Sequence, residues 1–161
     1  MRNISAEKQR ELERIAYIDH ITGGGNYAHF KKTLRDCMEP GYLISMDIHD
    51  FKIINSICGI IKGDETLKNI WRCIEKSLTS KDLAGHINAD RFAIYCRCDD
   101  KDEVIECIHK IGEGLKDITE ALKIPNIIPY YGISHWKHGK KVEEAYSEAN
   151  LQRIRLKSVK I

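Results

Sequence analysis

Two carboxylates stand where the sequence predicts that backbone strands end or turn. Asp47 closes the apolar stretch of a predicted strand over residues 42–48, and Asp90 lies between predicted strands over 83–88 and 91–98. A carboxylate where a strand leads into a helix is suited to hold Mg²⁺ together with nucleotide phosphates. The plainer interpretation is that Asp47 is a solvated edge residue and that Asp90 belongs to a polar turn with no further role.

More polar residues follow the first of these strands. Asp50 is expected to cap a short helix over 50–57 that contains Asn55, and Asp64 follows a connection over 59–63. Taken alone, Asp64 is most simply the N-cap of the next helix, because its side chain can accept from the open N–H groups there. The basic residues near the C-terminus are expected to complement the dipole of the last helix.

The elements that position these residues alternate between helix and strand. Periodic apolar residues predict helices in six places and apolar runs predict strands in four. The predicted helices cover 5–18, 27–39, 50–57, 64–78, 101–123 and 141–156, and the strands cover 42–48, 83–88, 91–98 and 126–136. This order favours the α+β class, with a split-βαβ, mostly antiparallel sheet and helices packed over it.

Composition sets further limits. The 161 residues suit one domain, and a net charge of +2 is too small to predict nucleic-acid binding from bulk electrostatics. Neither a membrane-spanning run nor a secretory signal is recognised, so we expect a cytoplasmic protein without a membrane segment. The six dispersed cysteines are expected to be buried free thiols, and His135 and His138 lack the second ligand pair of a zinc site.

Several spaced motifs together resemble the GGDEF domain of bacterial diguanylate cyclases, from about residue 14 to 158. The matched residues, in chain order, are Asp19, Thr22, Gly23, Asn26, Asp47, Phe51, Lys52, Asn55, Gly59, Gly63, Asp64, Leu67, Gly132, Ala149 and Lys157. The resemblance implies a ferredoxin-like, nucleotidyl-cyclase-like fold over residues 19–161. Residues 1–18 carry only a thin apolar stripe among charged residues, so we expect them to be a lead-in helix that links the domain to an upstream sensor or other signalling domain.

The chain departs from the family at the signature loop itself. The segment Asn88-Ala89-Asp90-Arg91-Phe92 occupies this place, so two glycines are missing and Arg91 replaces a carboxylate. Side chains at the first two positions would narrow the approach of a nucleotide. The family's inhibitory product site falls on Thr79-Ser80-Lys81-Asp82, where no arginine is present. We therefore expect no product site there.

The resemblance assigns roles to the residues that do match. It implies that Asn55 and Asp64 read guanine, that Phe51, Lys52 and Lys157 belong to the nucleotide site, and that Asp47 and Asp90 are metal ligands. Asp90 also occupies the family's catalytic position, and Arg91 would weaken the metal site. Mg²⁺ is expected only together with bound GTP.

These assignments favour one function and leave two alternatives. The favoured function is a degenerate, guanine-nucleotide-binding module of cyclic dimeric GMP signalling that regulates or dimerises without efficient turnover. An active diguanylate cyclase, which joins two GTP molecules between facing domains, is the first alternative. A protein-interaction domain with an empty pocket is the second.

Overall fold

The computed structural model describes residues 5–156, and the side chains as far as Gln152. This part of the chain contains six helices and four strands in the predicted order. The elements are α1 (Ala6–Tyr17), α2 (Tyr27–Arg35), β1 (Gly41–His49), α3 (Phe51–Cys58), α4 (Ile60–Ser77), β2 (Leu83–Asn88), β3 (Arg91–Cys96), α5 (Lys101–Leu122), β4 (Ile128–Trp136) and α6 (Val142–Leu156).

The four strands form one antiparallel sheet in the order β2-β3-β1-β4. Strand β1 is therefore central, and it pairs along its whole length with β4 and along most of it with β3. The sequence prediction of an α+β fold with a mostly antiparallel sheet is confirmed. Because β1 is a central strand, Asp47 is not an edge residue. The interpretation of Asp47 as a solvated edge residue was therefore wrong.

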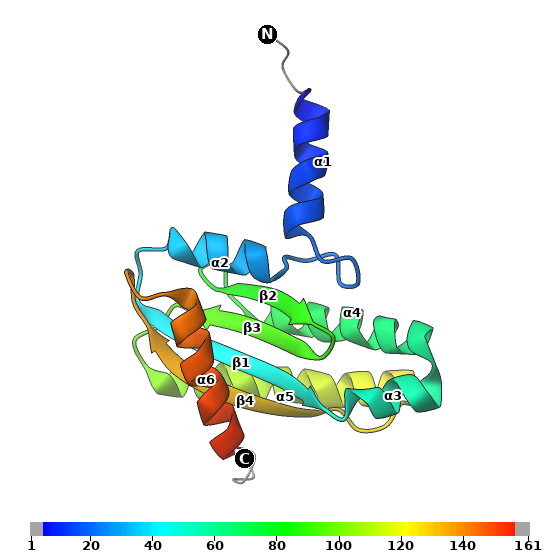
Figure 1. The fold of residues 1–161 in the computed structure, drawn as a ribbon. Coiled ribbons are helices and arrows are strands. Elements are labelled where there is room, and N and C mark those ends of the chain that lie inside the picture. The colour runs from blue at the N-terminus through cyan, green and yellow to red at the C-terminus, as the bar shows by residue number, and fades with distance from the viewer. Residues whose placement is uncertain (1–4, 157–161) are drawn as a thin grey trace.

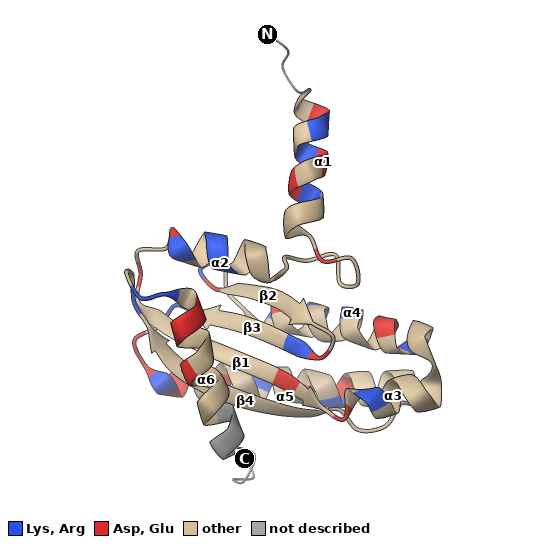
Figure 2. Ribbon diagram, viewed as in Figure 1, with Lys and Arg blue, Asp and Glu red and all other residues tan. Residues whose placement is uncertain are grey.

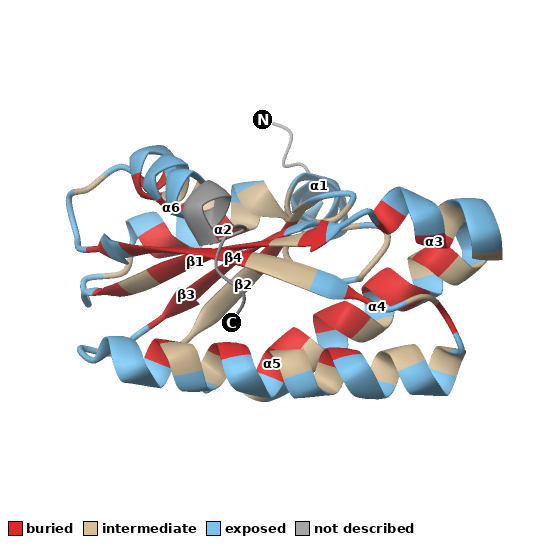
Figure 3. Ribbon diagram, turned by 90° about the horizontal axis from the view of Figure 1, so that it is seen from below, coloured by how far each residue is buried: buried red, intermediate tan, exposed pale blue. Residues whose placement is uncertain are grey.

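Helices cover both faces of the sheet (Figures 1 and 3). Helices α4 and α5 lie over one face, where Ile70, Ile74 and Ile111 pack against sheet residues such as Ile44. Helices α2 and α6 lie over the other face, where Phe30 and Leu34 join residues of α6. Apolar residues on both sides of β1 explain why its sequence is a continuous apolar run rather than an alternating one.

Helix α4 begins at Ile60, earlier than the sequence predicted. Gly59 has a φ of +89°, which lets the chain end α3 and start α4 with no loop between them. The expected connection over 59–63 is thus mostly helical, and Asp64 lies one turn inside α4. The expectation that Asp64 is an N-cap was wrong.

Helix α1 stands away from the rest of the domain (Figure 1) and carries charges of both signs along its length (Figure 2). Its N-cap is Ser5, whose hydroxyl oxygen accepts from the Lys8 N–H at 3.1 Å, and none of its residues is buried. Among the described residues, no helix is long and apolar enough to cross a membrane.

All six cysteines are free thiols, but only Cys96 is buried and the other five are half-buried. The expectation that they are uniformly buried was wrong, because most of them lie at the rim of the core.

Candidate functional site

The junction between β1 and α3 forms the first part of the site. Asp47 lies near the end of β1 with 15% of its side chain exposed. The chain then passes through Asp50, which adopts a left-handed conformation with a φ of 52°. The Asp50 carboxylate does not cap α3 as expected, because it lies instead against the neighbouring His49 ring, 2.9 Å from Nε2. The Asp50 side chain therefore makes no capping hydrogen bond at the start of α3.

The hairpin between β2 and β3 forms the second part. Ala89 and Asp90 make its turn, and Ala89 has a φ of 35°, a conformation that glycine adopts more easily than alanine. The Asp90 carbonyl accepts from the Ile48 N–H at 2.9 Å, which fastens the turn to the end of β1. In the β1–β3 register Arg91 lies opposite Asp47, with 4.0 Å between Arg91 Nε and Asp47 Oδ1. The fold thus brings Asp47, Asp90 and Arg91 together.

The carboxylates at this junction suit Mg²⁺ only when a nucleotide shares the ion. Within residues 5–156, no group of three or more His, Cys, Asp or Glu side chains is arranged to hold a metal ion. Mg²⁺ commonly takes only one or two carboxylates and completes its shell with phosphate oxygens and water. Asp47 and Asp90 fit that pattern together with a nucleotide. The guanidinium of Arg91 lies next to Asp47, and its positive charge repels a divalent cation there.

The third part lies where α3 meets α4. The side-chain oxygen of Asn55 is buried and has no hydrogen-bond partner among the described residues, and it packs directly against the backbone of Gly63. Phe51 is buried beside the same glycine, whereas Lys52 is exposed. Asp64 follows Gly63 and is half-buried. A buried polar oxygen without a partner is unusual in a folded protein and calls for an explanation.

The predicted site residues form two groups, apart from Lys157, which lies outside the residues that the structure describes. One group is the pair of carboxylates at the end of β1 and in the hairpin turn. The other is the set of residues on α3 and α4. Helix α3 begins at Phe51, shortly after Asp47, and so connects the two groups.

The turn over residues 79–82 uses its own carboxylate internally. Asp82 Oδ2 accepts from the Thr79 N–H at 2.9 Å and from the Thr79 hydroxyl at 3.1 Å. Asp82 Oδ1 accepts from the Arg97 N–H at 2.9 Å. Both oxygens of this carboxylate are therefore engaged in holding the turn.

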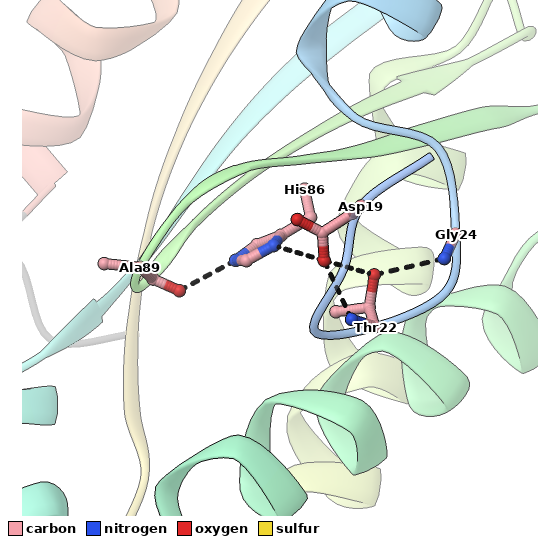
Figure 4. A network of polar contacts seen from close by, with 5 residues as sticks. All are labelled: Asp19, Thr22, Gly24, His86 and Ala89. Carbon is pink, nitrogen blue, oxygen red and sulfur yellow. Dashed lines mark hydrogen bonds and ion pairs between the residues drawn. The ribbon is translucent and has the colours of Figure 1, made fainter. Parts of the chain in front are cut away.

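His86, a residue of β2 that is 1% exposed, was not predicted from the sequence. Its ring lies between Asp19, in the turn after α1, and the carbonyl of Ala89 in the hairpin turn (Figure 4). A lone histidine in an apolar strand carries no periodic signal. Its position next to the signature loop was the only available hint.

Known proteins share the sequence pattern and the fold of this chain. The sequence matches the family described as diguanylate cyclase, GGDEF domain, over residues 16–160. The probable diguanylate cyclase DgcC of Escherichia coli strain K12 is 28% identical over 128 residues, which are 75% of this chain and 33% of that protein. The diguanylate cyclase DgcS of Shewanella oneidensis is 29% identical over 138 residues, which are 81% of this chain and 44% of that protein. The chain thus spans less than half the length of these curated relatives.

Solved structures share the fold. The crystal structure of the coiled coil and GGDEF domain of DgcB from Caulobacter crescentus, in complex with c-di-GMP, has a TM-score of 0.81 to this chain. The match covers 94% of this chain and 86% of that chain at 17% identity, so it supports the fold and not a shared activity. Because the family match extends over nearly the whole chain, the chain belongs to the GGDEF domain family.

Proposed function

We propose that this domain binds a guanine nucleotide and serves as a regulatory or dimerising module of cyclic dimeric GMP signalling without efficient turnover. The observation that carries the proposal is the position of Arg91 against Asp47, 4.0 Å apart. A carboxylate at position 91 would add a second negative charge beside that of Asp47. The guanidinium of Arg91 instead neutralises the negative charge of Asp47.

The positive charge of Arg91 supports the proposed lack of efficient turnover of GTP. Two unit charges 4 Å apart interact by about 4 kcal/mol at an effective dielectric constant of about 20. Arg91 is 45% exposed, so water and salt reduce that figure. A loss of even about 2.7 kcal/mol of transition-state stabilisation is roughly a hundredfold in rate. The alanine in the left-handed position of the hairpin turn adds a side chain where the family has glycine.

The residues of α3 and α4 support retained nucleotide binding. The buried side-chain oxygen of Asn55 can accept a hydrogen bond, and its amide group can also donate one. A carboxylate at Asp64 can accept from the N1–H and amino groups of guanine, which adenine does not present in that pattern. With Asp64 inside α4 rather than at its start, a capping role no longer accounts for this residue.

The proposal extends to the surroundings of the domain. We place it in the cytoplasm, where GTP is available, with Mg²⁺ entering only together with the nucleotide. Helix α1 stands apart from the body and buries none of its residues, which suits a lead-in helix that connects to an upstream domain. A homodimer is the expected assembly if the domain regulates by dimerising.

Calorimetric titration with GTP and with ATP tests the proposal, each with Mg²⁺ and with a chelator. We expect GTP to bind, ATP to bind at least about tenfold more weakly, and the chelator to change GTP affinity little because Arg91 already neutralises the site. Chromatography after incubation with GTP and Mg²⁺ or Mn²⁺ should detect no cyclic dimeric GMP above trace. Robust product formation would establish the active cyclase instead. Absence of GTP binding at millimolar concentration would leave the protein-interaction alternative.

A further inference from the structure

A cavity of about 130 Å³ lies between α5 and β4, on the face of the sheet that α4 and α5 cover. Three isoleucines form its apolar wall, Ile105 and Ile108 from α5 and Ile133 from β4. Ile108 and Ile133 are each 6% exposed, and Ile105 is half-buried. We call this space the edge cavity, because β4 is the outermost strand on this side of the described sheet.

A buried tyrosine also belongs to the wall of the edge cavity. Tyr131 of β4 is 7% exposed, and its hydroxyl has no hydrogen-bond partner among the described residues. Burial raises the pKa of Tyr131, and the nearby thiols of Cys73 and Cys107 raise it further, so the hydroxyl keeps its proton at neutral pH. Buried tyrosine hydroxyls usually have a partner. The hydroxyl of Tyr131 is therefore a donor that the described residues leave unused.

The rim of the edge cavity is polar and carries a positive charge. Lys101 and His109 of α5 and Gln152 of α6 form this rim, and all three are exposed. The residues that line the cavity include neither aspartate nor glutamate. Among the ion pairs of residues 5–156, none involves Lys101. The ammonium group of Lys101 is thus available to an anion at the rim.

The size of the edge cavity restricts what it can hold. A cavity of about 150 Å³ lined by aliphatic and aromatic side chains is large enough to bind benzene. The edge cavity therefore suits a single ring and is too small for a nucleotide or a folded peptide. An apolar wall suits the ring itself, and the lysine at the rim suits an acidic group attached to it.

We propose that the edge cavity binds a small aromatic acid, with the ring against the three isoleucines and the carboxylate at Lys101. A hydroxyl group on the ring accepts, in addition, from Tyr131. The site lies on the opposite face of the sheet from Asp47, because Tyr131 pairs with Met46 and successive residues of a strand point to opposite faces. The inference therefore goes beyond the proposed function and does not depend on nucleotide binding.

Benzoate is the first probe, and carbon–proton NMR of the isoleucine methyl groups is the measurement. We expect the signals of the three wall isoleucines to shift and to saturate at millimolar benzoate. Ile60 and Ile61, which are 72% and 88% exposed at the start of α4, report non-specific contact and should not shift. Shifts of every exposed isoleucine alike, or no shift of the wall isoleucines at about 10 mM benzoate, would overturn the proposal.

Further probes separate the groups of the ligand. Benzyl alcohol lacks the charge and should bind about twofold to fivefold more weakly than benzoate. Acetate lacks the ring and should not bind measurably. Among the ortho, meta and para hydroxybenzoates, at least one should bind about twofold to tenfold more tightly than benzoate and should lose this gain in Tyr131→Phe. If benzyl alcohol or acetate binds as tightly as benzoate, or if no hydroxybenzoate shows the gain, the proposed ligand is wrong.

Variants with matched controls test the site from the side of the protein. Ile105→Phe fills the cavity and should abolish the shifts, whereas Ile118→Phe, at a half-buried residue of the same helix outside the lining, should keep benzoate affinity. Lys101→Gln should weaken benzoate about twofold to fivefold and leave benzyl alcohol unchanged. Lys116→Gln, at an exposed lysine of α5 outside the lining, should change neither.

The same spectra distinguish this site from the nucleotide site. Saturating GTP should leave benzoate affinity unchanged, and benzoate should still bind if GTP does not bind at all, in which case only the proposed function fails. Unchanged benzoate affinity in both Ile105→Phe and Lys101→Gln would overturn the proposal, as would displacement of benzoate by GTP. Urea denaturation of each variant shows whether it is folded, and Lys101→Gln at the exposed rim serves if Ile105→Phe is not.

Discussion

Arg91 lies directly opposite Asp47 in the antiparallel ladder of β3 and β1, with Arg91 Nε 4.0 Å from Asp47 Oδ1. The aspartate is 15% exposed and the arginine 45%, so the pair is open to solvent at the end of two inner strands of the sheet. The positive charge of Arg91 therefore lies beside the Asp47 carboxylate, which would otherwise attract a cation.

Replacing Arg91 by glutamate should raise the Mg²⁺ affinity of the GTP-loaded protein by at least about tenfold, because a negative charge then joins Asp47. A Mg²⁺ titration of the GTP-saturated protein measures this. Arg97→Glu is the control, since Arg97 pairs with Glu39 at 3.2 Å beyond the other end of β3. Equal Mg²⁺ affinity in wild type and Arg91→Glu would contradict the role given to this arginine.

Replacing Asp64 by asparagine should weaken GTP binding by roughly 1.5–3 kcal/mol, the value of a hydrogen bond to a charged group. The free energy of unfolding should change little, since Asp64 lies inside α4 and does not cap it. Calorimetry and urea denaturation measure the two quantities. Glu65→Gln, at the next residue of the same helix and exposed, should leave both unchanged. If Asp64→Asn binds GTP as wild type does, this residue does not read the base.

Replacing Gly63 by alanine should weaken GTP binding without unfolding the domain. A methyl group at this position would collide with the side-chain oxygen of Asn55, which must then rotate away. Alanine in place of a helical glycine otherwise favours the helix by up to about 1 kcal/mol. Gly112→Ala in α5, where a methyl group meets nothing within 4 Å, should gain that stability and keep GTP affinity. Unchanged GTP affinity in Gly63→Ala would exclude Asn55 from the nucleotide site.

Cyclic dimeric GMP should not bind at residues 79–82, because both Asp82 oxygens already accept hydrogen bonds from the chain. Adding the dinucleotide should leave the amide NMR signals of this turn in place. GTP, added as a positive control, should move signals around Asn55 and Asp64. Movement of the Thr79 and Asp82 signals at micromolar dinucleotide would show that a product site exists here after all.

Replacing Asp19 by asparagine should destabilise the fold in a pH-dependent way. The folded-state pKa of Asp19 lies below its ordinary value of 3.8, so its contribution to stability is present above that value and is lost as the pH falls through the lowered one. The variant should therefore be less stable by about 1–3 kcal/mol at neutral pH and should approach wild type in strong acid. Urea denaturation across this range measures the difference, with Asp99→Asn as an exposed control. A difference that grows toward acid would contradict the assignment.

Much of the fold could be predicted from the sequence because apolar periodicity reports directly on buried faces. The stripe of α5, with Val104, Ile108 and Ile111 inward, and the apolar run of β1 were both readable in this way. The motifs around Asp47, Asn55 and Asp64 were likewise visible, because their spacing survives where the signature loop has changed.

The tertiary structure decided what depends on contacts between distant residues. The start of α4 was misplaced because a positive φ at Gly59 removes the loop that two glycines suggested. The bridge from Asp19 through His86 to Ala89 joins segments about 70 residues apart, and no local pattern encodes it. The sequence by itself determined which residues could serve a nucleotide site, since residue type and spacing are local. Only the fold decided that Arg91 faces Asp47, because strand register places side chains opposite one another across the ladder.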